Sequence, residues 1–244
     1  MTKKTKNKPA VRVEDKSEFV YQGERLPISL NIRDFPWTEK QKKFIEIGLD
    51  KNTNYLFCQA VVGVGKTLLS VYIGLNLLNE GKIKNIYFVR QPVESSSFGL
   101  GFLGGDFDEK MSPYAGPLMD HLNELIPQGQ INKLLEGGFI QSIPIGFLKG
   151  RTFNNSLIIL DEAEDLATQD FRLSLSRLGK FSKMIIIGDA KQSNVKNNGF
   201  LKVFNLFDSE DCKNNGIFTY SFGSEDIMRN KILGFVMDKL DSLT

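Results

Sequence analysis

The chain alternates between two patterns of apolar residues from Thr38 onward. Short runs rich in β-branched residues predict strands buried on both faces, and stretches with a 3.6-residue period predict amphipathic helices. The predicted strands are Asn54–Cys58, Asn85–Val89, Phe139–Ile145, Leu157–Leu160, Met184–Ile187 and Ile217–Phe222. The predicted helices are Thr38–Asp50, Lys66–Asn79, Tyr114–Ile126 and Ile131–Leu135. This alternation is typical of an α/β fold whose mostly parallel sheet is covered by helices on both faces.

Two further helices are predicted from their end residues. Thr168 is a candidate cap for a helix that ends before Gly179, and Ser224 is a candidate cap for the last helix of the chain. The apolar face of the first helix consists of Phe171, Leu175 and Leu178. That of the second consists of Ile227, Met228, Ile232, Phe235 and Leu240.

The first 16 residues differ from the rest of the chain. They are polar and charged without periodicity, so we expect a flexible basic arm at 1–16 and a single domain at 17–244. The arm is either a solvated tail or a segment that holds phosphates. Five positive residues precede Glu14, and removing them from the net charge of +2 leaves −3. Attraction to nucleic acid must therefore come from the arm or from local patches.

Composition excludes several other classes of protein. The chain has 244 residues, of which 41% are hydrophobic, and this is enough for a substantial core. No apolar stretch is long enough to cross a bilayer, so we expect no membrane partner and a cytoplasmic protein. Two cysteines do not form a disulfide framework, and we expect Cys58 and Cys212 to be reduced, buried and inert.

A phosphate-binding loop is the clearest motif. Residues 60–67, Ala-Val-Val-Gly-Val-Gly-Lys-Thr, follow a predicted strand and precede a predicted helix, which is the context that the motif requires. Gly63 and Gly65 let backbone amides turn around phosphate oxygens. Lys66 is expected to reach the β and γ phosphates, and Thr67 is expected to ligate Mg²⁺. The nucleotide-binding residues are predicted to be Gln41, Val62, Gly63, Val64, Gly65, Lys66, Thr67 and Leu68.

Two acids follow the predicted strand Leu157–Leu160. Ligands of open α/β sheets bind beyond the carboxyl ends of the strands, where Asp161 and Glu162 are placed. Asp161 is a candidate Mg²⁺ ligand, and Glu162 is a candidate for orienting or deprotonating the attacking water. Adjacent acids at a strand end are also common surface charges, but here they follow a phosphate loop.

Two glutamines complete the candidate site. Gln192, after the strand Met184–Ile187, is positioned to contact the γ-phosphate or the water; the alternative is a turn in which Gly188 and Asp189 simply end the strand. The Gln41 amide offers a donor and an acceptor that match N6 and N7 of adenine. Trp37 nearby either stacks on the base or anchors the core.

These residues resemble the PhoH family of ATPases, whose core is similar to the motor domain of superfamily-one helicases. The resemblance covers roughly Phe35 to Leu240. Its most specific segments are Gly99–Asp106, Glu109–Tyr114, Lys149–Thr152, Leu157–Ala163 and Ser224–Arg229. It implies an ATP- and Mg²⁺-dependent ATPase with a RecA-like core, working as a hexameric ring and acting on RNA or single-stranded DNA. The single domain looks more like the bacteriophage type, which would place the protein in the host cytoplasm.

The resemblance also assigns three arginines, Arg90, Arg151 and Arg229. An arginine donated across a subunit boundary stabilises charge on the transferring γ-phosphate. Arg229 is the first candidate for this role and Arg151 the second, and either could instead be a structural ion-pair partner. The chain departs from the family at Glu164, where glutamine is common, and at Asn230, where histidine is common. Both departures concern coupling to nucleic acid.

Three functions are compatible with these features. The first is a ring-forming ATPase directed at nucleic acid, in which the Gly-rich segment Phe98–Asp106 either faces a partner or is a slack surface loop. The second is a small-molecule kinase, but the acid pair suits water activation and no lid or acceptor pocket is evident. The third is an assembly factor in which ATP closes subunit interfaces without driving a motor.

Overall fold

The computed structural model describes residues 26–91, 107–189 and 199–228, together with Ile232, Phe235, Val236 and Lys239. For residues 107–114 it describes the helical backbone alone. Several predictions fall outside these residues: the arm at 1–16, the Gly-rich segment Phe98–Asp106, Gln192 and Arg229.

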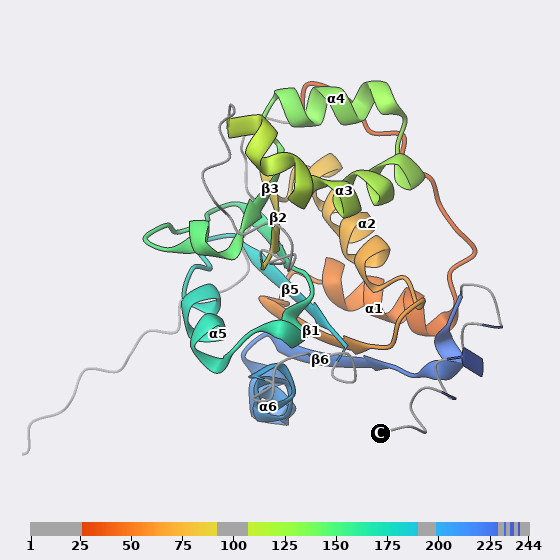
Figure 1. Ribbon diagram of the computed structural model, residues 1–244, viewed down its shortest axis with the longest axis vertical. Coiled ribbons are helices and arrows are strands. Elements are labelled where there is room, and N and C mark those ends of the chain that lie inside the picture. The colour runs from red at the N-terminus through yellow and green to blue at the C-terminus, as the bar shows by residue number, and fades with distance from the viewer. Residues whose placement is uncertain are drawn as a thin grey trace, which may run out of the picture.

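Six strands form one sheet in which every pairing between neighbours is parallel. The strands are β1 (Tyr55–Ala60), β2 (Asn85–Arg90), β3 (Ile140–Pro144), β4 (Ser156–Leu160), β5 (Lys183–Gly188) and β6 (Ile217–Phe222). Their order is β3-β2-β4-β5-β1-β6, so β5 lies between β1, which leads into the phosphate loop, and β4, which leads into the acid pair. The carboxyl ends of β1, β2, β4 and β5 therefore meet at one edge of the sheet (Figure 1).

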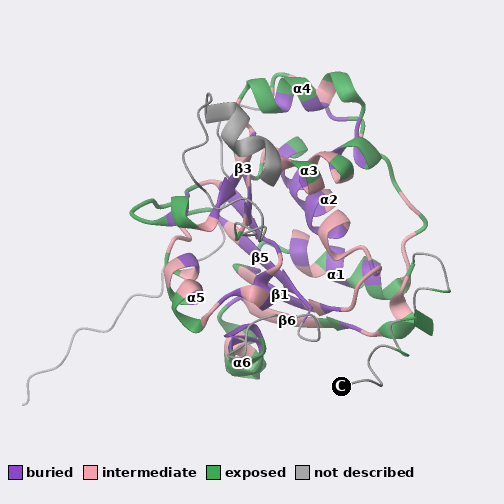
Figure 2. Cartoon of the chain, in the orientation of Figure 1, coloured by how far each residue is buried: buried purple, intermediate pink, exposed green. Residues whose placement is uncertain are grey.

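Helices cover both faces of the sheet, as the sequence predicted (Figure 2). The first face packs against α1 (Glu39–Leu49), α2 (Lys66–Asn79), α3 (Phe107–Leu125) and α4 (Gln128–Glu136). The second face packs against α5 (Thr168–Leu175) and α6 (Gly199–Phe207). The sheet residues alternate between the two cores: Leu56 and Cys58 point to the first and Phe57 to the second. The result is a three-layer α/β fold that matches a P-loop NTPase.

The structure differs from the sequence predictions mainly on the second face. Helix α5 ends at Leu175, so the prediction that Leu178 belongs to its apolar face was wrong. Leu178 instead forms an isolated parallel bridge with Phe153. Thr168 is the first helical residue, and Asp170 caps the helix by accepting from the backbone N–H of Ala167 over 3.0 Å. Helices α6 and α7 (Glu210–Asn214) were not predicted.

In the described part of the chain, three short 3-10 helices connect the larger elements: η2 (Ile145–Leu148), η3 (Ala163–Asp165) and η4 (Ser224–Asp226). The predicted last helix therefore does not begin at Ser224: a 3-10 turn comes first, and helical backbone is described at Ile232, Phe235, Val236 and Lys239. No helix among the described residues is both long and apolar enough to cross a membrane.

Both cysteines are free thiols, as predicted. Cys58 is buried, and burial raises its pKa to about 12, which fits an inert thiol. Cys212 is only half-buried, so the prediction that it is buried was wrong. It lies in α7, a short surface helix that has no buried residues.

Candidate functional site

The phosphate loop connects β1 to α2 at the carboxyl edge of the sheet. Gly63 and Gly65 have φ angles of 89° and 84°, a left-handed region that side chains disfavour. Gly65 occupies the N-cap position of α2, and its carbonyl accepts from Leu69 N–H over 2.9 Å. Val64 between them is fully buried and anchors the loop in the core. The two glycines thus have the conformation that the motif predicts for a loop whose amides surround phosphate oxygens.

Two separate segments hold the loop from outside. The Nε2 atom of Gln41 in α1 donates to the carbonyl of Val64 over 3.1 Å. The backbone N–H of Met228 donates to the carbonyl of Gly63 over 3.0 Å. The loop conformation therefore depends on the start of α1 and on the segment that follows β6.

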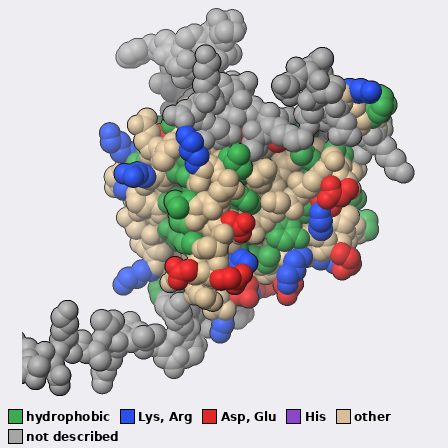
Figure 3. Space-filling model, turned by 90° about the horizontal axis from the view of Figure 1, so that it is seen from below, with side chains coloured by type: hydrophobic (Ala, Val, Ile, Leu, Met, Phe, Trp, Pro, Cys, Tyr) green, Lys and Arg blue, Asp and Glu red, His purple; other side chains and the backbone are tan. Residues whose placement is uncertain are grey.

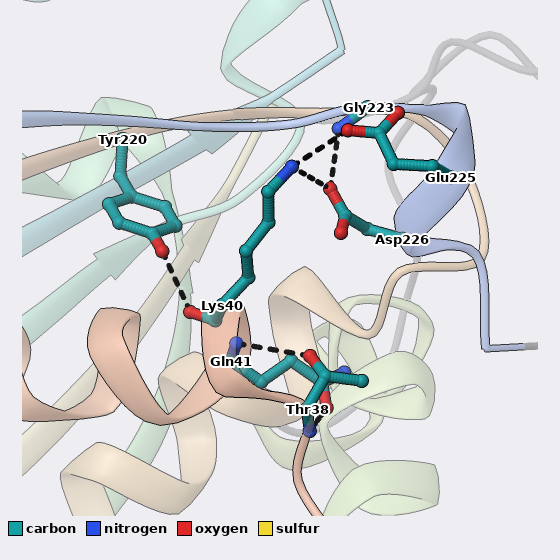
Figure 4. Close-up of polar contacts among 7 residues, drawn as sticks. All are labelled: Thr38, Lys40, Gln41, Tyr220, Gly223, Glu225 and Asp226. Carbon is teal, nitrogen blue, oxygen red and sulfur yellow. Dashed lines mark hydrogen bonds and ion pairs between the residues drawn. The ribbon is translucent and has the colours of Figure 1, made fainter.

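These two segments are themselves joined through Lys40 (Figure 4). Its Nζ atom lies 2.7 Å from Oε1 of Glu225 and 2.7 Å from Oδ2 of Asp226, while its carbonyl accepts from the Tyr220 hydroxyl over 2.8 Å. The Asp226 carboxylate also accepts from the Gly223 N–H. The hydrogen bonds that Lys40 donates to the carboxylates of Asp226 and Glu225 raise the pKa of Lys40. No local sequence pattern indicates this group, because Lys40 is 180 to 186 residues away from Tyr220, Glu225 and Asp226 in the chain.

Gln41 has a second role at the start of α1. Its Oε1 atom accepts from the backbone N–H of Thr38 over 3.0 Å, and Thr38 Oγ1 accepts from Gln41 N–H, which forms a capping box. Gln41 is buried, at 4% exposed. Each amide atom retains one further hydrogen-bonding position, so a contact with adenine stays a prediction.

The structure places Trp37 in an aromatic cluster. Its ring centroid lies 5.0 Å from that of Phe35 and 5.0 Å from that of Tyr72 on α2. The indole N–H donates to Asp34 over 2.9 Å, and the ring packs against the core of the first face. These contacts are those of a core anchor, one of the two roles predicted for Trp37.

The phosphate loop and the acid pair meet at Thr67. Its hydroxyl donates to Oδ1 of Asp161 over 3.2 Å, so the residue after the loop contacts the acid that follows β4. Asp161 is 2% exposed, and this burial raises its pKa to about 6, although the charges of Arg90 and Lys66 lower it. A hydroxyl and a carboxylate at this distance are two of the oxygen ligands that Mg²⁺ prefers, with phosphates and water as the others. The predicted metal ligands Thr67 and Asp161 therefore fit the ion.

Arg90, the last residue of β2, contacts both acids. Its Nε atom lies 3.0 Å from Oδ2 of Asp161, and its Nη2 atom donates to Oε1 of Glu162 over 2.7 Å. Because β2 and β4 are neighbours, the guanidinium at the end of one strand reaches the acids after the other. The sequence marked Arg90 as a family arginine but did not indicate this pairing.

Glu162 has an unusual backbone conformation, with φ 54° and ψ 43°. A non-glycine residue in the left-handed region is strained, and such strain is concentrated at functional sites. The turn lifts the side chain out of the core, so Glu162 is 42% exposed whereas Asp161 is buried. Glu162 is therefore accessible to a water molecule while Arg90 holds it.

The two other arginines that the resemblance assigns are not seen beside the acid pair. Arg151 lies apart from it, and Arg229 is outside the described residues. The guanidinium carbon of Arg151 lies 4.7 Å from the Phe153 ring centroid and 5.7 Å from that of Tyr87, and the residue is exposed. Its backbone carbonyl accepts from Arg177. Arg151 thus does not meet Asp161 and Glu162 within its own chain. Arg229 follows Met228 directly but lies outside the described residues, as does Gln192.

The described surface carries charges of both signs. Seen from below, basic and acidic side chains are interspersed with apolar ones (Figure 3). This mixture agrees with the small net charge of +2.

Comparison with known proteins identifies the family. The family model described as PhoH-like protein matches residues 35–241. The PhoH-like protein of Bacillus subtilis (strain 168) is 39% identical over 142 residues, which are 58% of this chain and 44% of the relative. That of Mycobacterium tuberculosis (strain ATCC 25618 / H37Rv) is 30% identical over 206 residues, which are 83% of this chain and 56% of the relative. Protein PhoH of Escherichia coli (strain K12) is 29% identical over 182 residues, which are 72% of this chain and 50% of the relative.

The chain spans about half the length of these relatives. The family match nevertheless includes the phosphate loop, the acid pair and the segment after β6. Together with the parallel α/β fold, the match indicates a nucleotide-binding protein. The chain belongs to the family of PhoH-like proteins.

Proposed function

We propose that the protein hydrolyses ATP in a Mg²⁺-dependent reaction. The observation that carries this proposal is the contact between Thr67 of the phosphate loop and Asp161 of the acid pair, with Glu162 held beside them by Arg90. A phosphate loop alone fits any nucleotide-binding protein. An exposed carboxylate next to the metal ligands suits activation of water.

In the proposed reaction, Glu162 accepts a proton from a water molecule as the water oxygen attacks the γ-phosphorus. The bond between the γ-phosphorus and the bridging oxygen breaks, and the electron pair leaves with ADP. Lys66 and the loop amides stabilise the negative charge on the phosphate oxygens. Mg²⁺, held by Thr67 and Asp161, would supply further charge neutralisation when bound.

Two variants test this assignment. Lys66→Ala should lose ATP binding, and Glu162→Gln should bind ATP while turning over at least about a hundredfold more slowly. Lys84→Ala, at an exposed lysine near the opposite end of β2, is the matched control and should behave like the parent. Hydrolysis by Lys66→Ala at the parental rate would refute the site.

We further propose that the active form is a homo-oligomeric ring that acts on RNA or single-stranded DNA. The resemblance to PhoH ATPases suggests six subunits. The support is the likeness to helicase-like motors and the exposed position of Arg151, together with Arg229 in the matched segment. In this proposal Arg229 of one subunit completes the site of its neighbour.

Mixing experiments test the ring. Arg229→Ala subunits mixed with Lys66→Ala subunits should recover part of the parental activity, and Arg151→Ala subunits serve as the alternative donor-deficient partner. Mass measurements with and without ATP should show the assembly. Turnover with RNA and with single-stranded DNA at two salt concentrations tests the nucleic-acid partner. Slow turnover unaffected by either would favour the alternative, an ATP-gated assembly factor.

A further inference from the structure

We propose that Glu164 is a positioning residue for Glu162: as a carboxylic acid, it donates a hydrogen bond to the Glu162 carboxylate. This inference rests on the proposed function, because it assigns Glu162 the task of activating water. Glu164 itself touches neither nucleotide nor water in this proposal.

The position of Glu164 is the first argument. It lies in η3, directly after the acid pair, and is 1% exposed. A Cβ atom added to Gly188, at the end of β5, would lie 3.0 Å from Oε2 of Glu164 and 3.1 Å from its backbone nitrogen. The missing side chain at Gly188 therefore leaves the space that the buried carboxyl occupies. A charged carboxylate in such a place is costly, whereas a protonated acid is not.

The second argument is the contact between two acids. The side chain of Glu164 lies close enough to that of Glu162 for a hydrogen bond, and two carboxyl groups share such a bond only when one of them carries a proton. Burial, then this bond, raises the pKa of Glu164 to about 8. Backbone hydrogen bonds of Glu164 and Asp189 act in the opposite direction. Because Glu164 is buried and Glu162 is exposed, the proton belongs on Glu164.

The third argument is the order of the strands. Glu162 follows β4, which lies between β2 and β5. Arg90 at the end of β2 donates to Oε1 of Glu162 from one side, and Glu164 packs beside Gly188 at the end of β5 on the other. Arg90 and Glu164 would thus donate from opposite sides and fix the direction of the Glu162 side chain, whose backbone is in the left-handed region. The other acids that face this pair are Asp161, which interacts with the charge of Glu162, and Asp189, whose backbone hydrogen bond reaches Glu164; the cation that contacts Glu162 and Asp161 is Arg90.

Turnover as a function of pH tests the proposal. Glutamine has the shape of the protonated acid and keeps a donor without titrating. The parent should lose about tenfold in kcat between pH 7 and pH 9, as Glu164 ionises, while Glu164→Gln should lose less than about twofold. Glu164→Ala should turn over at least about tenfold more slowly than Glu164→Gln at pH 7, with unchanged ATP affinity. Glu136→Gln, at an exposed position that ends α4, is the control and should keep the parental profile.

A second measurement does not depend on activity. The infrared spectrum of the nucleotide-free parent at pH 7 should contain a carboxylic-acid carbonyl band that Glu164→Gln lacks and Glu136→Gln retains. Identical spectra for the parent and Glu164→Gln would overturn the proposal even in a protein that does not hydrolyse ATP. Equal loss of kcat with pH in the parent and Glu164→Gln would also overturn it. Failure of the parent to hydrolyse ATP would instead refute the proposed function, and the infrared band alone would then decide whether Glu164 holds its proton.

Discussion

The guanidinium of Arg90 donates to Glu162 over 2.7 Å and lies 3.0 Å from the buried Asp161, so one side chain orients both acids of the candidate site. Arg90 is 20% exposed, which limits screening by solvent. A planar guanidinium can reach two separate carboxylates, whereas a lysine ammonium is a single point charge. Arg90 is therefore expected to contribute both to stability and to catalysis.

Replacing Arg90 by alanine should lower the free energy of unfolding by about 2–3 kcal/mol at pH 8, because it leaves Asp161 buried without its cation. The loss should shrink at pH 5, where Asp161, with a pKa of about 6, is protonated. Urea unfolding at the two pH values measures both effects. Arg90→Lys should not restore ATP turnover. Arg172→Ala, on the exposed side of α5, is the control, and equal losses at both pH values would contradict the prediction.

Local sequence patterns predicted much of the fold. Helix α2 and strand β6 have the predicted bounds, since β1, the loop glycines and a run of apolar residues specify the first, and flanking glycines delimit the second. Helix α6 was missed although Phe200, Val203, Phe204 and Phe207 have helical spacing. That spacing could have identified it.

The finer structure of the site depends on distant parts of the chain. The Arg90 pairing joins residues more than 70 positions apart, and the left-handed backbone of Glu162 depends on the packing of η3 against β5. No local pattern encodes either feature. Glu164 did stand out as a departure from the family, but its burial became visible only with the position of Gly188.

Gln41→Ala should weaken ATP binding by about 5- to 30-fold, since it removes the hydrogen bond that holds Val64 of the phosphate loop. If the amide also contacts adenine, the affinity for ATP should fall more than the affinity for GTP. We expect this difference. Calorimetric titration with both nucleotides measures it. Thr38→Ala is the control for the capping box, because it removes the cap and keeps the Gln41 amide. Equal weakening of ATP and GTP would restrict Gln41 to supporting the loop.

Lys40 should matter for the loop more than for folding. Lys40 and Glu225 are exposed, and Asp226, at 10% exposed, keeps its hydrogen bond from the Gly223 N–H, so Lys40→Met should lower the urea midpoint only slightly. The same change loosens the segment whose Met228 N–H holds Gly63, and ATP affinity should fall severalfold at low salt. Salt at about 1 M screens the pairs and should remove the difference between the parent and the variant. A difference that persists at high salt would contradict an electrostatic origin. Lys42→Met, on the same helix, is the control.

The nucleotide-free protein should lose stability as the pH rises from 5 to 8. Asp161 and Glu164 have pKa values raised to about 6 and about 8, so the folded protein holds protons that the unfolded chain has released above about pH 5. Raised acid pKa values stabilise the folded state at low pH, and this stabilisation disappears as the pH rises through them. The slope should reach about 1.4 kcal/mol per pH unit for each such proton.

Urea unfolding in the presence of a chelator, at pH 5 to 8, measures this slope, because bound Mg²⁺ would favour the ionised form of Asp161. Glu164→Gln should flatten the curve between pH 6 and 8 and leave the part near pH 5 to 6, where Asp161 titrates. Above about pH 8 the trend should weaken, because burial lowers the pKa of Lys183 to about 8 and its loss of a proton favours the folded state. Stability that rises steadily from pH 5 to 8 would contradict the burial of two protonated acids at this edge of the sheet.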